Sequence, residues 1–294
     1  MTNLGPFTVN RIGFGAMQLA GPGVFGPPRD PENARAVLRR AVELGADHID
    51  TAQYYGPDVV NDLIREALHP YPEGLRLVTK VGGRRDEQGA WLPALTPEEL
   101  RAGVEDNLRS LRVERMDLVN LRQIEGADVP FADQLGALEE LRQEGKLALI
   151  GLSNVGRPAV EEALELVDVA GVQNGYSLLD RSSEDVLELC AERGMTFVPF
   201  FPLGSAFTGG PAKLAGDPAI ARVAAKHGAT PTQVALAWLL HRDASILLIP
   251  GTSTLSHLEE NMAAGDLALD AEDLEAPKAV EQVGDPLGAV AHDD

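Results

Sequence analysis

Short apolar runs rich in β-branched residues alternate with longer amphipathic runs from one end of the chain to the other. This alternation limits the possible folds most, because it is typical of parallel βαβ units. Eight runs have the composition of strands, at residues 12–16, 48–51, 77–80, 117–122, 147–153, 171–174, 196–201 and 246–250. Eight strands within 294 residues match a single α/β barrel of the (β/α)8 or TIM type. We therefore expect residues 1–294 to form one barrel domain.

Several of the intervening helices have explicit start signals. Asp30 followed by Pro31 combines a favoured cap residue with proline at the first helical position. Thr96 and Thr230 are each followed by proline and then, three residues after the threonine, by Glu99 and Gln233. This spacing is that of the capping box. The sequence therefore predicts helices that begin directly after residues 30, 96 and 230.

Four long connections each follow a predicted strand, at residues 21–29, 82–95, 123–130 and 204–216. In barrels of this type the loops after the strands form one face, and that face carries the active site. We therefore expect a functional site built from these loops and from side chains at strand ends.

Four polar side chains are candidates for that face. Asp50, Lys80 and Arg122 end predicted strands, and Tyr55 lies in the loop after the first of these strands. Taken singly, each has a structural explanation, such as capping the next helix or packing under a loop. Together they suggest more: the Lys80 ammonium favours the Tyr55 phenolate, and the Asp50 carboxylate keeps Lys80 charged. This arrangement predicts a Tyr55 pKa below the usual value of about 10. We interpret this group as a general-acid device, with Tyr55 as the proton donor.

Charge and cysteine content exclude several other functions. With 25 Lys and Arg against 45 Asp and Glu, the net charge is −20, which argues against nucleic acid or an anionic membrane as partner. Cys190 is the only cysteine, so neither an intrachain disulfide nor a cysteine metal site is possible. The histidines lack metal-ligand spacing, and we expect His48 to be buried and hydrogen-bonded. The sequence has no signal peptide or membrane span, so we expect a cytoplasmic monomer or weak homo-oligomer without a metal.

The chain resembles the aldo-keto reductase superfamily in a series of ordered motifs. They are GFGAM at 13–17, HIDTA at 48–52 with YG at 55–56, TK at 79–80, GLSN at 151–154, VQN at 172–174, PLG at 202–204, and IPG at 249–251 with EN at 260–261. The resemblance implies a (β/α)8 barrel with a short N-terminal β-hairpin that binds NADPH without a Rossmann fold. It also implies that Asp50, Tyr55 and Lys80 are catalytic.

The same resemblance implies the cofactor-binding residues. Ser153, Asn154 and Gln173 would hold the nicotinamide carboxamide, and Phe200 would stack on the nicotinamide ring. Thr252, Ser253, His257, Glu260 and Asn261 would form the adenosine-phosphate end of the site. The remaining cofactor contacts implied by the motifs are Gly15, Met17, Pro202, Leu203, Gly204 and Gly251.

Two positions depart from the family pattern. Arg122 stands where the family has its catalytic histidine, and His257 stands where the family has a basic contact to the cofactor 2′-phosphate. The arginine, within DLVNLR at 117–122, is similar to the bacterial pyridoxal reductases, which reduce pyridoxal to pyridoxine with NADPH. So are the stretches at 15–28, 199–204 and 236–240. A guanidinium cannot act as an acid near neutral pH, but its forked donors can hold two oxygens at once.

We therefore interpret Arg122 as a bridge between the aldehyde oxygen and the ring 3-oxide of pyridoxal, with an ion pair to an acidic loop residue such as Glu125 as the structural alternative. The net charge favours free pyridoxal over its 5′-phosphate. One alternative function is a broad-specificity aldehyde or ketone reductase with a pocket of Phe25, Trp91 and Phe207. Another is an NADPH-binding sensor or channel-associated subunit without turnover.

Overall fold

The computed structural model describes residues 1–126, 128–205 and 209–276. Its main sheet has seven parallel strands in the order β11-β10-β9-β8-β5-β4-β3. Their bounds are β3 Phe14–Gly15, β4 His48–Asp50, β5 Arg76–Val81, β8 Met116–Arg122, β9 Leu147–Ser153, β10 Val169–Gly175 and β11 Thr196–Phe200. These strands coincide with seven of the eight predicted runs.

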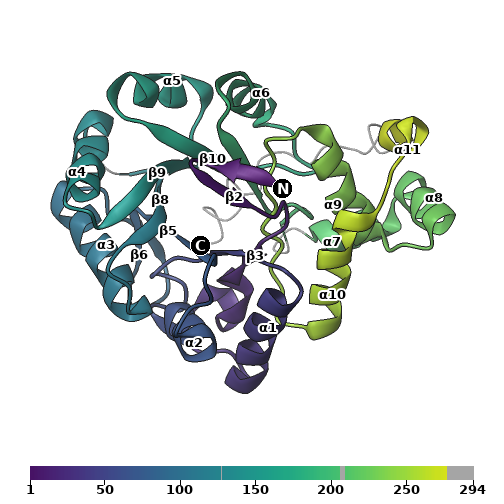
Figure 1. Cartoon of the computed structure of the whole chain (residues 1–294), viewed down its shortest axis with the longest axis horizontal. Helices are drawn as coiled ribbons and strands as arrows, with labels where there is room; N and C mark the ends of the chain where they lie inside the picture. The colour runs from purple at the N-terminus through teal and green to yellow at the C-terminus, as the bar shows by residue number, and fades with distance from the viewer. Residues whose placement is uncertain (127, 206–208, 277–294) are drawn as a thin grey trace.

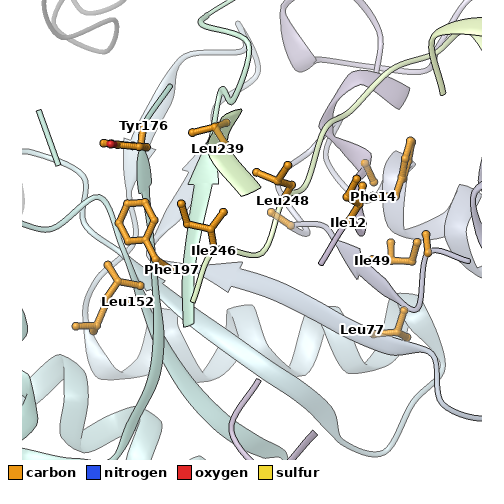
Figure 2. Packing of buried hydrophobic residues seen from close by; sticks show 14 of the residues in the cluster. Ile12, Phe14, Ile49, Leu77, Leu152, Tyr176, Phe197, Leu239, Ile246 and Leu248 are labelled. Atoms are coloured by element: carbon orange, nitrogen blue, oxygen red, sulfur yellow. The ribbon is translucent and has the colours of Figure 1, made fainter. Parts of the chain in front are cut away.

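The eighth predicted run, 246–250, closes the barrel through isolated bridges. It does not form a continuous strand, because only single residues of it pair with the neighbouring segments. Ile246 bridges Phe197 and Leu248 bridges Ile12, both in parallel. The amide of Leu247 donates to the Phe197 carbonyl at 2.9 Å, and the amide of Gly13 donates to the Leu248 carbonyl at 2.8 Å. Figure 2 shows the apolar side chains that pack along this seam. The predicted (β/α)8 architecture is confirmed, with a closure that uses few hydrogen bonds.

Helices surround the strands on the outside of the barrel (Figure 1). They are α1 Pro31–Glu43, α2 Val59–Leu68, α3 Pro97–Leu111, α4 Phe131–Gln143, α5 Arg157–Leu166, α6 Glu184–Arg193, α7 Gly210–Gly216, α8 Pro218–His227, α9 Pro231–Arg242, α10 Leu255–Ala263 and α11 Ala271–Glu275. The predicted starts are confirmed: the Asp30 side chain caps α1, and complete capping boxes at Thr96 and Thr230 begin α3 and α9. Short 3₁₀ turns occupy Ala16–Leu19, Pro22–Val24 and Ala264–Asp266.

Two antiparallel hairpins stand outside the main sheet. The predicted N-terminal hairpin consists of β1, Thr2–Leu4, and β2, Phe7–Val9. Leu4 and Val9 pack with buried side chains of the barrel interior, so this hairpin plugs one end of the barrel (Figure 1). The second hairpin, β6 Gly83–Arg85 with β7 Trp91–Pro93, lies within the stretch 82–95 that the sequence predicted as a loop. Among the described helices, none is long and apolar enough to cross a membrane.

Candidate active site

The barrel interior changes from apolar to polar along the strands. Val78 of β5 and Leu118 of β8 pack against the N-terminal hairpin. Two residues further on, the same faces carry Lys80 and Asn120, because side chains on one face of a strand recur every second residue. Both are buried. The polar layer therefore lies at the carboxyl ends of the strands, the end away from the hairpin plug, as the sequence predicted.

Lys80 and Asp50 form a buried ion pair in this layer. Lys80 Nζ lies 2.5 Å from Asp50 Oδ1, and both side chains are less than 5% exposed, at 3% and 4%. Lys80 Nζ also donates to the carbonyl of Thr51 at 3.0 Å. The second carboxylate oxygen, Asp50 Oδ2, accepts from Gln173 Nε2 at 2.8 Å. The carboxylate and the ammonium are therefore paired and hydrogen-bonded, which is the condition for keeping buried charges.

Tyr55 lies against this pair, with its ring centroid 5.0 Å from Lys80 Nζ. The predicted lowering of its pKa is wrong for this structure. The pKa of Tyr55 is raised above its usual value, first by burial of the phenol and then by the charge of Asp50, while Arg122 lowers it. Desolvation is the largest of these causes, and Lys80, which is paired with Asp50, does not offset it. Tyr55 therefore keeps its proton at neutral pH, which a proton donor requires.

Arg122 points into the same mouth from the end of β8. Its Nη1 donates to Ser153 Oγ at 3.0 Å, and its guanidinium lies over the Phe200 ring, 5.0 Å from the centroid. Within the described ranges, Arg122 pairs with neither Glu125 nor another carboxylate. Most of its five donors therefore have no partner in the described part of the chain and can bind a ligand.

Of the residues assigned to the nicotinamide, Gln173 is the best placed to accept a further hydrogen bond. Its Nε2 is used by Asp50, and its Oε1 is buried without a hydrogen-bond partner among the described residues. An orphaned carbonyl oxygen in the polar layer fits the NH₂ group of a carboxamide. Ser153 lies opposite Gln173 in the pairing of β9 with β10, whereas Asn154 is exposed and donates to the Gln123 carbonyl at 3.0 Å. The residues present thus fit a nicotinamide at this position.

The glycines assigned to the cofactor have a structural reason of their own. A Cβ on Gly15 would lie 2.5 Å from the Ile249 carbonyl oxygen, and a Cβ on Gly251 would lie 2.4 Å from the Gly15 carbonyl oxygen. Both glycines therefore permit the close backbone approach that closes the barrel. Met17 follows in the first 3₁₀ turn. Gly204, with φ of +75°, stands at the end of the 202–204 segment with Pro202 and Leu203, after β11.

The residues assigned to the adenosine phosphate gather on one segment, the 251–254 loop and α10. Thr252 Oγ1 accepts from the Thr254 amide, and the Thr254 side chain makes no capping hydrogen bond to α10. The first amides of α10 therefore remain without a side-chain cap, an arrangement suited to an anion. Ser253 and His257 are exposed, Glu260 is half-buried and Asn261 is buried.

Sequence reasoning missed Arg85, on the unpredicted hairpin. Arg85 lies over the rings of Trp91 at 4.0 Å and Phe25 at 5.4 Å, and it donates to the carbonyls of Gly23, Val24 and Gly89 at 2.5–3.1 Å. Phe25 and Trp91 were expected to form an aromatic pocket with Phe207, which lies outside the described residues. Both rings contact the Arg85 guanidinium, which ties β6–β7 to the 21–26 loop.

Comparison with known proteins agrees with this geometry. Residues 11–282 match the model of the Aldo/keto reductase family. The chain is 50% identical over 274 residues to pyridoxine 4-dehydrogenase of Escherichia coli, covering 92% of this chain and 94% of that protein. An aldo-keto reductase from Klebsiella pneumoniae in complex with NADPH superposes with a TM-score of 0.77 at 25% identity, covering 94% and 93% of the two chains. A thermostable aldo-keto reductase in complex with the inhibitor epalrestat gives a TM-score of 0.80 at 27% identity, covering 95% and 98%. The chain is an oxidoreductase that belongs to the aldo/keto reductase family.

Proposed function

We propose that this enzyme reduces pyridoxal to pyridoxine with NADPH. The observation that carries the proposal is Arg122, which points into the mouth of the barrel with most of its donors unused. The identity of 50% to a pyridoxine 4-dehydrogenase supports the same substrate, and the NADPH complex of a solved relative supports the cofactor. When bound, NADPH supplies the hydride that reduces the formyl carbon.

Tyr55 donates the proton that the new alkoxide oxygen requires. Because burial and Asp50 raise its pKa, the phenol is protonated at neutral pH and ready to donate. Lys80 and Asp50 form a buried ion pair beside the phenol, with Lys80 Nζ 5.0 Å from the centroid of the Tyr55 ring. As the alkoxide develops negative charge, Arg122 is the positive group whose field at Tyr55 favours release of the proton.

Arg122 also orients the substrate. Pyridoxal presents two neighbouring oxygens, the aldehyde oxygen and the ring 3-oxide, and a guanidinium fork can hold both. Since Arg122 covers one face of Phe200, a stacked nicotinamide would use the other face of that ring. Free pyridoxal is the proposed substrate rather than its 5′-phosphate, because a protein of net charge −20 repels an added phosphate. We also place the enzyme in the cytoplasm, where its buried free thiol at Cys190 stays reduced.

The test compares pyridoxal with its 3-deoxy analogue in the wild type and in Arg122→His. We expect the substitution to slow pyridoxal much more than the analogue, because only pyridoxal offers the second oxygen. Equal slowing of both substrates would refute the bridge. If unrelated aldehydes turn over as fast as pyridoxal, the enzyme is a broad-specificity reductase. Binding of NADPH without turnover of any aldehyde would instead favour the sensor function.

A further inference from the structure

A chain of buried polar side chains lies on the outer surface of the barrel, directly behind the Asp50–Lys80 pair. Thr51 follows β4 and Thr79 lies on β5, while Asn61 and Asn107 come from α2 and α3. All four have no exposed surface. They sit in the layer between helices and sheet, which apolar residues such as Val60, Ile64, Leu100, Val104 and Leu111 otherwise fill.

The hydrogen bonds of these side chains form a continuous path from one strand to the next. Thr51 Oγ1 donates to Asn61 Oδ1 at 2.8 Å, and Asn61 Nδ2 donates to Asn107 Oδ1 at 2.9 Å. Thr79 Oγ1 donates to the same Asn107 oxygen at 2.7 Å. The path ends on the helices: Asn107 Nδ2 donates to the Gly103 carbonyl at 2.7 Å, and Asn61 Nδ2 also donates to Ser110 Oγ at 3.0 Å.

Stability alone does not require this polar path. A fully satisfied buried network and a well-packed apolar layer of the same shape differ little in free energy, and the apolar layer is often the more stable. Hydrogen bonds add a defined geometry, which apolar contacts specify less sharply. The question is therefore which groups the path holds in place.

The two threonines are sequence neighbours of the buried ion pair. Because side chains alternate across a strand, Thr51 and Thr79 point outward where Asp50 and Lys80 point inward. The backbone of Thr51 also takes part on the inner side, since its carbonyl accepts from Lys80 Nζ at 3.0 Å and its amide donates to the Val78 carbonyl at 2.8 Å. The outer path and the inner ion pair thus clamp the same two strand ends from opposite faces.

We propose that Asn107, together with Asn61, Thr51 and Thr79, is a set of positioning residues that holds Asp50 and Lys80 under the Tyr55 ring. Asn107 is the central member, because its single oxygen accepts from both α2 and β5. This inference rests on the catalytic roles proposed above for Asp50, Tyr55 and Lys80. It adds that the rate of proton transfer depends on side chains that contact neither the substrate nor the cofactor.

The test uses Thr79→Val, which removes one hydroxyl and keeps the branched shape that suits a strand. We expect kcat for aldehyde reduction to fall roughly tenfold with KM unchanged, because small misplacement of a catalytic group is costly. The alkaline fall in kcat, which the raised Tyr55 pKa places above about pH 9 in the wild type, should also move to lower pH, because a displaced Asp50 carboxylate raises that pKa less. Thr79→Ser, which restores the hydroxyl, should recover the wild-type rate and profile.

The matched control is Ser110→Ala, which removes a hydroxyl from the same network without touching either strand. Its kcat should stay within about twofold of the wild type, even where its melting temperature falls as much as that of Thr79→Val. Thr51→Val repeats the test from the other strand if Thr79→Val does not fold. Loss of stability in Thr79→Val with unchanged kcat and pH profile would overturn the proposal, and so would an equal loss of kcat in Ser110→Ala.

These outcomes are separate from those of the proposed function. The variants are assayed with pyridoxal and with 4-nitrobenzaldehyde, so the positioning role can be measured even if pyridoxal is a poor substrate. If Tyr55→Phe keeps full activity, the catalytic assignment fails whatever the threonine variants do.

Discussion

Gln173 donates from Nε2 to Asp50 Oδ2 at 2.8 Å, which joins a residue assigned to the cofactor to a residue of the proposed catalytic pair. The two lie 123 positions apart in the sequence, on β10 and β4. Through this bond, the orientation of Asp50 and the direction of the free Gln173 Oε1 depend on each other. A change at Gln173 should therefore affect both cofactor binding and the ion pair.

We expect Gln173→Met to raise the Kd for NADPH roughly tenfold. This factor corresponds to about 1.4 kcal/mol, which is the size of one lost hydrogen bond. The same variant leaves Asp50 Oδ2 without a donor, so its melting temperature should also fall. The control is Gln134→Met, which removes a buried glutamine of α4 whose amide donates to the Val129 carbonyl. That control should lose stability and retain its NADPH affinity, as measured by cofactor fluorescence titration. Unchanged NADPH binding in Gln173→Met would contradict the assignment.

Tyr55→Phe should lower kcat for reduction by about 10³, within the range for loss of a general acid, and should leave NADPH binding unchanged. Because the pKa of Tyr55 is raised by burial and by Asp50, the wild-type phenol stays protonated through mildly alkaline pH. The wild-type kcat should therefore show no loss from Tyr55 ionisation between about pH 6 and pH 9. Stopped-flow measurement of NADPH oxidation across this range checks both statements. A fall in kcat with an apparent pKa near 7 that disappears in Tyr55→Phe would show that the phenol is acidic.

Lys80→Met should be strongly destabilising, because it leaves the Asp50 carboxylate buried and unpaired. Removing one member of a buried pair costs about 3–5 kcal/mol. The double variant Lys80→Met with Asp50→Asn removes both charges and should recover much of that loss, while activity stays absent. Urea unfolding midpoints and kcat measured together separate the two effects. Similar midpoints for the single and double variants would mean that the pair is not what stabilises this layer.

Arg85→Lys should loosen the β6–β7 hairpin, because lysine cannot lie between Trp91 and Phe25 and reach three carbonyls at once. Trp91 also contacts Tyr54 edge-on, with centroids 5.7 Å apart, and Tyr54 contacts Tyr55 in the same way at 5.5 Å. We therefore expect a several-fold rise in KM for the aldehyde.

Trp91 fluorescence gives a direct reading of the hairpin in a Trp238→Phe background, since Trp91 and Trp238 are the two tryptophans of the chain. Acrylamide should quench Trp91 more strongly in Arg85→Lys. Arg84→Lys, at the exposed neighbouring position on β6, is the control and should change neither KM nor quenching. Equal quenching in both variants would remove Arg85 from this role.

His48 should make the enzyme sensitive to acid. His48 is buried as expected, but the expectation that it is hydrogen-bonded is wrong at Nδ1, which has no partner among the residues described. Burial lowers the pKa of His48 to about 4, against about 6.5 in the unfolded chain. The unfolded state therefore binds the extra proton between these values, and stability is lost as pH falls through this window. The loss is about 3 kcal/mol in total.

His48→Gln, which cannot take up that proton, should show a correspondingly flatter dependence of unfolding free energy on pH between 6.5 and 4. His241→Gln, at an exposed position, serves as the control and should keep the wild-type slope. Equal slopes for His48→Gln and the wild type would assign the acid sensitivity to other groups.

Local sequence signals predicted the parts of this fold that depend on neighbouring residues. The caps at Asp30, Thr96 and Thr230 are interactions across three residues, so they can be recognised from spacing alone. The β6–β7 hairpin was missed because its strands are three residues long and none of their residues is buried, so they lack the apolar alternation of a core strand. Residues 246–250 were predicted as a strand from their apolar composition. Their pairing is limited to isolated bridges with Ile12 and Phe197, which depends on residues far away in the sequence.

The sequence by itself determined the alternation of strands and helices, the helix starts, the family motifs and the gathering of Asp50, Tyr55, Lys80 and Arg122 at one end of the barrel. The tertiary structure alone decided the direction of the Tyr55 pKa shift, the partner of Arg122 and the polar path through Asn61 and Asn107. Periodicity and capping depend on residues a few positions apart, so they can be recognised in the sequence. The direction of a pKa shift depends on burial and on charges from distant strands, and the folded chain alone sets both.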